Sequence, residues 1–212
     1  MAVTAGTVEA AAEAALAGSL VVFPTDTVYG IGTRPDRPEA TARLFRAKGR
    51  ERGTALPVLV PSLDVAREVA AFDERAERLA AAFWPGGLTL ILPRTVASSD
   101  WDLGGDGATV GLRIPAHRLA SAVLAAAGPL ATSSANRSGE PPATTCAAVR
   151  RTFGDLVAVY VCSDDPVDGA ASSVLDLAHG APVLVRSGDV ASEEIERSLP
   201  GEEALLDSPP SP

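Results

Sequence analysis

Two contrasting kinds of sequence meet in the stretch LVVFPTDTVYGIG, residues 20–32. Its first four residues, Leu20 to Phe23, are all apolar, and such a short apolar run predicts a buried strand. Hydroxyl groups, an aspartate and two glycines follow over residues 25–32, and they predict a polar turn punctuated by glycine. We therefore expect a strand buried in a sheet that leads directly into a group of polar side chains.

Helical and strand patterns intermix along the rest of the chain. Val8, Ala12 and Leu16 recur at helical spacing until Gly18, and further helices are predicted over residues 39–47, 65–72, 76–83, 119–126 and 145–153. Apolar runs predict strands over residues 56–60, 88–92, 110–114, 130–133, 157–162, 173–177 and 183–186. Since no break in composition separates them, we predict one α/β domain over residues 5–198. The acidic, Pro- and Ser-rich segment 199–212 is expected to be disordered.

Composition excludes several classes of protein. Apolar residues make up 46% of the chain, but no apolar run approaches the roughly 20 residues that a membrane helix needs. The alanine-rich N-terminus has no basic region, so no secretory signal is visible. Cys146 and Cys162 form no CxxC pair and are expected to be separate thiols in a reducing cytoplasm. His117 and His179 lack companions at metal-ligand spacing, so no metal site is expected.

Charge is unevenly distributed along the chain. The net charge of −9 argues against indiscriminate binding of nucleic acid. Residues 34–52, however, hold seven basic and three acidic side chains. A local basic field in an acidic protein suits a polyanionic ligand such as a nucleoside triphosphate. A solvated, arginine-rich helix face is the alternative, and we favour it for Arg37, Arg43 and Arg46.

The chain has a single lysine, Lys48, and a single asparagine, Asn136. Lys48 precedes Arg50 by two residues and Ser134 precedes Asn136 by two, and in extended backbone such pairs project to one side. Lysine and arginine would neutralise phosphate oxygens, while serine and asparagine would add neutral donors and acceptors. Because GxxxxGK[ST], GxGxxG and GxSxG motifs are absent, we interpret this pattern as a clamp for a nucleotide. The alternative is that the single lysine and the single asparagine occur in these polar loops by chance and have no role in binding.

Five motifs occur in order: FPTDTVYGIG at residues 23–32, KGR at 48–50, WPGGLT at 84–89, VGLRIP at 110–115 and SANRSGEP at 134–141. Together they resemble the YrdC-like family of threonylcarbamoyl-AMP synthases, in its short bacterial (TsaC) form, from about Thr7 to Ile195. The resemblance implies a YrdC-like (DHBP synthase-like) α/β fold, with a twisted, mainly β sheet flanked by helices and a large concave, positively charged cavity. The extra C-terminal domain of the longer family members is not expected here.

The resemblance also implies an activity. Family members combine L-threonine, bicarbonate and ATP into threonylcarbamoyl-adenylate and pyrophosphate, and Mg²⁺ is expected with the triphosphate. A partner tRNA threonylcarbamoyl transferase then modifies the adenosine beside the anticodon of certain tRNAs. We therefore expect a cytoplasmic nucleotidyltransferase, with weak binding of double-stranded RNA or tRNA as a further expectation.

Residue roles follow from the same resemblance. Catalysis is carried over to Lys48, Arg50, Ser134 and Asn136. ATP binding is carried over to these four residues and to Thr54, Thr109, Pro142 and Arg186. Threonine binding is carried over to Thr27, Arg113, Thr132 and Ser172. From the residues alone, the hydroxyls of Thr27, Thr109 and Ser172 fit turns or strand ends, and Arg186 fits a surface charge.

Some segments depart from the family pattern. Thr54 follows the KxR motif where a longer polar residue is frequent, residues 171–174 read ASSV instead of ESTV, and Ser187 replaces a proline. Residues 33–36 are charged where the family is usually small and apolar. Three readings therefore remain: the synthase, a relative that forms another carbamoyl-adenylate, and a module that binds double-stranded RNA through the basic field.

Overall fold

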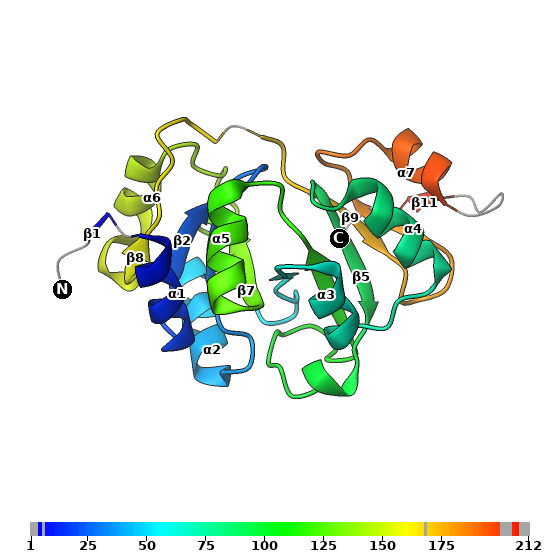
Figure 1. Cartoon of the computed structure of the whole chain (residues 1–212), viewed down its shortest axis with the longest axis horizontal. Coiled ribbons are helices and arrows are strands. Elements are labelled where there is room, and N and C mark those ends of the chain that lie inside the picture. The colour runs from blue at the N-terminus through cyan, green and yellow to red at the C-terminus, as the bar shows by residue number, and fades with distance from the viewer. Residues whose placement is uncertain (1–3, 6, 168, 200–204, 208–212) are drawn as a thin grey trace.

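One mixed sheet organises the molecule (Figure 1). A computed structural model describes residues 4–5, 7–167, 169–199 and 205–207. Within these residues the strands run in the order β1-β8-β2-β3-β7-β4-β6-β5-β9-β10-β11. Their bounds are β1 Thr4–Ala5, β2 Val21–Pro24, β3 Tyr29–Thr33, β4 Val58–Leu59, β5 Leu88–Pro93, β6 Thr109–Arg113, β7 Leu130–Ser134, β8 Val159–Tyr160, β9 Ser173–Asp176, β10 Val183–Arg186 and β11 Leu206–Asp207.

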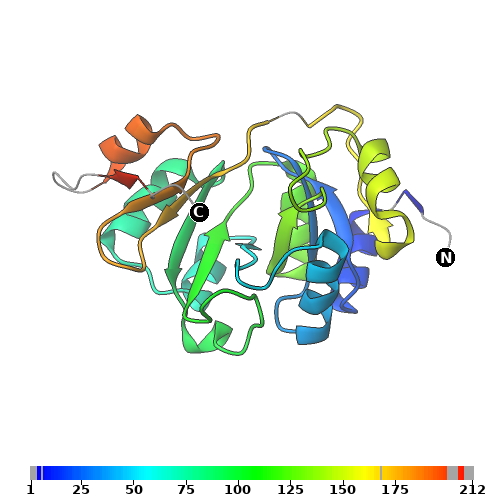
Figure 2. The same ribbon diagram turned by 180° about the vertical axis from the view of Figure 1, so that it is seen from behind.

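Helices cover the two faces of the sheet. The pair α1 and α5 lies side by side in front of the strands in Figure 1, and α2 is best seen from behind in Figure 2. The bounds are α1 Val8–Leu16, α2 Pro38–Lys48, α3 Leu63–Val69, α4 Glu74–Phe83, α5 Arg118–Ala127, α6 Cys146–Phe153 and α7 Ser192–Ser198, with 3₁₀ turns η1 Val96–Ser98 and η2 Gly154–Leu156. The α/β fold predicted from the sequence is confirmed.

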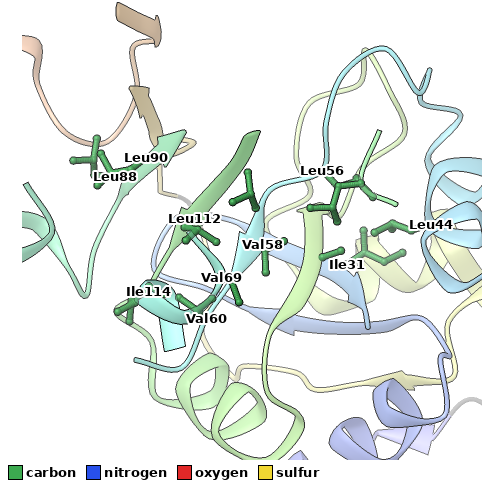
Figure 3. Close-up of a cluster of buried hydrophobic side chains, with 14 of the residues drawn as sticks. Ile31, Leu44, Leu56, Val58, Val60, Val69, Leu88, Leu90, Leu112 and Ile114 are labelled. Carbon is green, nitrogen blue, oxygen red and sulfur yellow. The ribbon is translucent and has the colours of Figure 1, made fainter. Parts of the chain in front are cut away.

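The strand predicted at residues 20–23 contributes side chains to two separate hydrophobic cores. Val21 and Phe23 of β2 pack against the α1–α5 pair, whereas Val22 packs in the larger core with Ile31 and Leu44. This division follows from the period of two along a strand. Because both faces are covered, every residue of β2 is buried. Figure 3 shows part of the larger core, where β4, β5 and β6 contribute alternate aliphatic side chains.

Residues 29–33 form strand β3, although the sequence predicted that the polar turn continues to Gly32. β3 pairs antiparallel with β2 on one side and with β7 on the other. A Cβ atom at Gly32 would lie 2.9 Å from Oγ1 of Thr132 on β7. The glycine therefore permits a close approach between strands, and the turn itself is confined to residues 25–28.

Other boundaries also differ from prediction. The strand expected over residues 157–162 is reduced to β8. Helix α7 was not predicted, because Ile195 is its single buried residue and no apolar period marks it. Leu206–Asp207 pair with β10 as strand β11, so the disorder expected for the tail is wrong at these two residues. Residues 200–204 and 208–212 of that tail lie outside the described residues.

The prediction of two separate thiols is contradicted by a disulfide between Cys146 and Cys162, whose Cα atoms lie 5.5 Å apart. Cys146 begins α6, and Cys162 follows β8. The η2 turn between these elements reverses the chain and brings the two residues together. Their spacing of 16 residues matches no short cysteine motif, so the pairing was not visible in the sequence.

Candidate active site

A cavity of about 560 Å³ opens on the sheet, within the range typical of small-molecule sites. Strands β3, β5, β6, β7, β9 and β10 contribute to its wall, together with the segments after β2 and α2. Its polar lining consists of Thr25, Thr27, Arg50, Thr54, Thr89, Thr109, Arg113, Thr132, Ser133, Ser134, Ser172 and Arg186. Among the described lining residues there is no carboxylate, so the charges in the wall are positive.

Arg113 is the most buried of these cations. The residue is 5% exposed and ends β6. Its Nε donates to the carbonyl of Gly86 at 2.8 Å, Nη1 to Oγ1 of Thr27 at 2.8 Å and Nη2 to Oδ1 of Asp26 at 2.5 Å. Burial lowers the pKa of Arg113, and the charge of Asp26 partly restores it. Three of its five N–H donors thus fix the guanidinium, and two are left for a ligand.

The turn after β2 holds Thr27 in place. Oγ1 of Thr25 accepts from the backbone N–H groups of Thr27 and Val28, both at 3.2 Å, and lies 3.1 Å from Oγ1 of Thr27. Such hydroxyl-to-backbone bonds stabilise tight turns. The Thr-Asp-Thr sequence therefore places one hydroxyl and one carboxylate against Arg113.

Two further arginines, Arg50 and Arg186, form a second cationic part of the wall. Arg50 donates from Nη2 to the carbonyl of Ala55 at 3.0 Å, and its pKa is lowered by burial and by the charge of Arg186. Arg186 donates to the carbonyl and the hydroxyl of Ser172 at 2.9 and 3.0 Å. Because the charge of Arg186 disfavours the charged form of Arg50, an anion bound between the two arginines would relieve that repulsion.

A bulge in β10 explains why neighbouring residues share the wall. The register with β9 shifts between Leu184 and Arg186. As a result Val185 and Arg186 both line the cavity, although adjacent residues of a regular strand face opposite sides. Val185 is 45% exposed, which is unusual for a large apolar side chain in a strand.

Lys48 and Asn136 lie next to the cavity and are not part of its lining. The Nζ of Lys48 is 3.3 Å from Oδ1 of Asn136 and also donates to the carbonyls of Ser134 and Asn136. The KxR and SxN segments therefore meet. Lys48 and Arg50 do not project to one side as predicted, because Lys48 ends helix α2 and Gly49 then turns the chain with a φ of 62°. Burial and the charge of Arg50 lower the pKa of Lys48 to about 8, while Glu140 acts in the opposite direction.

The other residues with expected roles all line the one cavity: Arg50, Thr54, Thr109, Ser134, Pro142 and Arg186 for ATP, and Thr27, Arg113, Thr132 and Ser172 for threonine. Sequence reasoning did not single out Thr25, Thr89 or Asp26. Thr25 and Asp26 lie inside the motif at residues 23–32, so their signal was present. Thr89 contacts Ser172 at 2.9 Å, a pairing of β5 with the start of β9 that no local pattern reveals.

Most of the basic side chains in residues 34–52 that are described next have partners within the protein. Arg34 pairs with Asp36 at 2.5 Å, Arg52 pairs with Asp102, and Arg43 donates to the carbonyl of Gly18 at 2.7 Å. Lys48 is buried and Arg50 faces the cavity. These engagements weigh against an open surface for RNA.

The described residues also bear on other classes of site. In that part of the chain, no three or more His, Cys, Asp or Glu side chains gather in a way that could hold a metal ion. None of the helices described there is both long and apolar enough to cross a membrane.

Comparison with known proteins agrees with this geometry. A family model for Sua5, YciO and YrdC proteins, described as "Telomere recombination", matches residues 13–188. The chain belongs to the Sua5/YciO/YrdC family. The family predicted from the five motifs is thus confirmed.

Individual family members are similar over most of this chain. A Mycobacterium tuberculosis (strain H37Rv) relative, provisionally named threonylcarbamoyl-AMP synthase, is 42% identical over 90% of this chain and 88% of its own length. The threonylcarbamoyl-AMP synthase of Bacillus subtilis is 35% identical over 84% of this chain and 52% of its own. The crystal structure of P. abyssi Sua5 complexed with L-threonine superposes with a TM-score of 0.84 at 35% identity. That match covers 93% of this chain but 58% of the Sua5 chain.

Proposed function

We propose that this protein is an L-threonylcarbamoyladenylate synthase, which forms threonylcarbamoyl-AMP and pyrophosphate from L-threonine, bicarbonate and ATP. One observation carries the proposal: a single cavity holds the buried Arg113 beside Thr27, and also the Arg50–Arg186 pair. The reaction joins two anionic partners, an amino acid with its carboxylate and a nucleotide with its phosphates. A cavity with two cationic parts suits both at once.

Threonine would bind at Arg113. The two N–H groups of Arg113 that are not used by Gly86, Thr27 and Asp26 would hold the carboxylate of the amino acid. Hydroxyl and backbone groups of Thr27, Thr132 and Ser172 would contact the rest of the molecule. These groups lie in strand β7, at strand ends or in a tight turn, which fix their positions before the substrate binds.

ATP would bind toward the Arg50–Arg186 pair. Ser134, Thr54, Thr109 and Pro142 would complete the nucleotide site, next to the segment that holds Asn136. Among the described lining residues there is no carboxylate that could serve as an anionic ligand for Mg²⁺. We expect Mg²⁺ to arrive as part of the Mg–ATP substrate, held by the triphosphate.

The chemistry would follow from positioning and charge. The threonine amine forms an N–C bond to the carbon of carbon dioxide and loses a proton, which gives a carbamate; when bicarbonate is the source, a C–O bond breaks and water leaves. A carbamate oxygen then forms a bond to the α-phosphorus while the bond from that phosphorus to the bridging oxygen breaks, and pyrophosphate leaves with the electron pair. Arg50 and Arg186 would stabilise the charge that develops on the phosphates. Enclosure by the cavity would protect the labile carbamate from water.

The product would serve a second protein. A tRNA threonylcarbamoyl transferase would accept the threonylcarbamoyl group and pass it to the adenosine beside the anticodon. ATP and tRNA are found together in the cytoplasm, so we propose that the enzyme acts there.

Pyrophosphate release tests the proposal. We expect release from the purified protein only when ATP, bicarbonate and L-threonine are all present. Glycine, L-serine and L-valine in place of threonine separate the synthase from a relative that forms another carbamoyl-adenylate. Release that is equally fast with another amino acid would favour that relative, and release that does not depend on any amino acid would contradict both.

A further inference from the structure

The end of α2 is joined to residues 134–140 by both the backbone and the side chain of one residue. The carbonyl of Lys48 accepts from the backbone N–H of Ser138 at 2.9 Å. Its Nζ donates to the carbonyl of Ser134 at 2.6 Å, to the carbonyl of Asn136 and to Oδ1 of Asn136 at 3.3 Å. The residue is 3% exposed and does not line the cavity.

The hydrogen-bonding capacity of Lys48 is fully used by these contacts. An ammonium group has three N–H donors and no acceptor. Three oxygens of the segment lie within hydrogen-bond distance of Nζ, one for each donor. A phosphate oxygen would have to displace one of them.

The segment is held from its other side by Asn136. Its Nδ2 donates to the carbonyls of Arg137 at 2.8 Å and Glu140 at 2.6 Å. The two side chains thus clasp residues 134–140, which we call the clasp segment. Ser134 at the start of the segment and Pro142 just beyond its end both line the cavity. The hydrogen bonds of Lys48 and Asn136 therefore help to fix the positions of these two residues.

Arg50 follows a different path from Lys48. Gly49 ends α2 with a φ of 62°, in the left-handed region, and this turns the chain. Arg50 then lies in the wall of the cavity. Of the two cations in the KxR motif, Arg50 therefore lies in the wall of the cavity and Lys48 contacts the clasp segment.

We propose that Lys48 is a positioning residue, which holds the clasp segment in the shape that places Ser134 at the nucleotide, and that it does not contact the nucleotide itself. The inference rests on the proposed function for the identity of the nucleotide. It also accounts for a lysine at this position in a chain whose other basic residues are arginine. A compact ammonium can converge on three oxygens from one point, whereas the planar fork of arginine cannot.

Amide hydrogen exchange of the clasp segment in the ligand-free protein is the direct test. Lys48→Met keeps the aliphatic stem, and Arg50→Met is the matched control because it removes a cation from the cavity wall. We expect exchange over residues 134–140 to rise about tenfold or more in Lys48→Met and to stay unchanged in Arg50→Met, since only Lys48 donates hydrogen bonds from a charged group to this segment. Unchanged exchange in folded Lys48→Met overturns the proposal. This outcome needs no enzymatic activity, so it is separate from a failure of the proposed function.

Two readouts distinguish positioning from a merely structural role. Ethylammonium added to Lys48→Ala should restore both slow exchange and adenylate formation, whereas tetramethylammonium, which has no N–H donor, should restore neither. In the wild-type protein, the ¹³Cε resonance of the single lysine should stay in place when pyrophosphate binds. A shift of that resonance as large as that of a directly bound lysine would overturn the proposal, even if no variant folds.

Discussion

Arg113 combines near-complete burial with a place in the wall of the cavity. At 5% exposure it depends on Asp26, Thr27 and the carbonyl of Gly86 for the hydrogen bonds that water would otherwise supply. A carboxylate ligand would complete this set, because two N–H donors are left. The three hydrogen bonds from the protein set the orientation of the guanidinium.

Replacing Arg113 by lysine tests this reading. Arg113→Lys keeps the charge but loses the fork that reaches Asp26, Thr27 and a ligand together. We expect the KM for L-threonine to rise by about tenfold or more, with a much smaller change in the KM for ATP. Steady-state kinetics with Arg186→Lys as control should give the opposite pattern, and equal effects on both KM values would speak against separate sites.

The single lysine permits a direct measurement of one pKa. Burial and Arg50 lower the pKa of Lys48 to about 8 from its ordinary value of 10.5. The folded state therefore binds fewer protons than the unfolded state between these values, so the contribution of Lys48 to the free energy of unfolding rises with pH across this window. ¹³Cε-lysine NMR should show one resonance that titrates near 8 in the folded protein and near 10.5 in urea. A folded midpoint near 10.5 would show that burial does not act on this group.

At the scale of elements, the end of α2 depends on Gly49. Its φ of 62° costs a residue with a Cβ atom roughly 1–2 kcal/mol, and no atom lies within 4 Å of the place a Cβ would take. We expect Gly49→Ala to lower the free energy of unfolding by about 1 kcal/mol through backbone strain alone. Urea unfolding measures the change. Gly53→Ala is the matched control, since its surroundings are equally open and its φ is outside the left-handed range, and a similar loss there would refute the explanation.

The disulfide ties the start of α6 to the residue after β8. Closing a loop of 16 residues restricts the unfolded chain and contributes about 3 kcal/mol. We expect a reductant to lower the urea midpoint of the wild-type protein, and the Cys146→Ser/Cys162→Ser variant to unfold at the same low midpoint with or without reductant. Equal midpoints for the oxidised wild type and the double variant would mean that the bond does not form in solution.

Elements with a strong local pattern were predictable, and those that depend on distant partners were not. Helix α1 lies where it was predicted because an apolar residue recurs at helical spacing and Gly18 marks its end. Strand β10 lies where it was predicted because a short apolar run marks it. Strand β3 was missed because its glycines signal a turn locally and serve close packing on Thr132 in the fold. The Cys146–Cys162 bond was missed because nothing in the spacing shows that η2 reverses the chain.

At the scale of the whole molecule, the sheet brings together segments that are far apart in sequence. β3 pairs with β7 across about a hundred residues, and β5 pairs with β9 across more than eighty. These pairings place Thr27, Ser134, Thr89 and Ser172 around one cavity. The resemblance to a family pointed to Thr27, Ser134 and Ser172 but not to Thr89. Periodicity alone could identify none of them, because it carries no information on which strands are neighbours. The same limit applied to Lys48, whose three acceptors belong to a segment 86 to 88 residues away.

We propose that one cavity joins threonine and ATP through a carbamate. Mass spectrometry of the adenylate formed from ¹³C-bicarbonate, L-threonine and ATP measures this most directly. We expect a threonylcarbamoyl-AMP that carries one ¹³C atom from the wild-type protein, and a strong loss of it from both Arg113→Ala and Arg50→Ala when circular dichroism shows that they fold. Absence of labelled adenylate from the wild-type protein, or its undiminished formation by both folded variants, would contradict the claim.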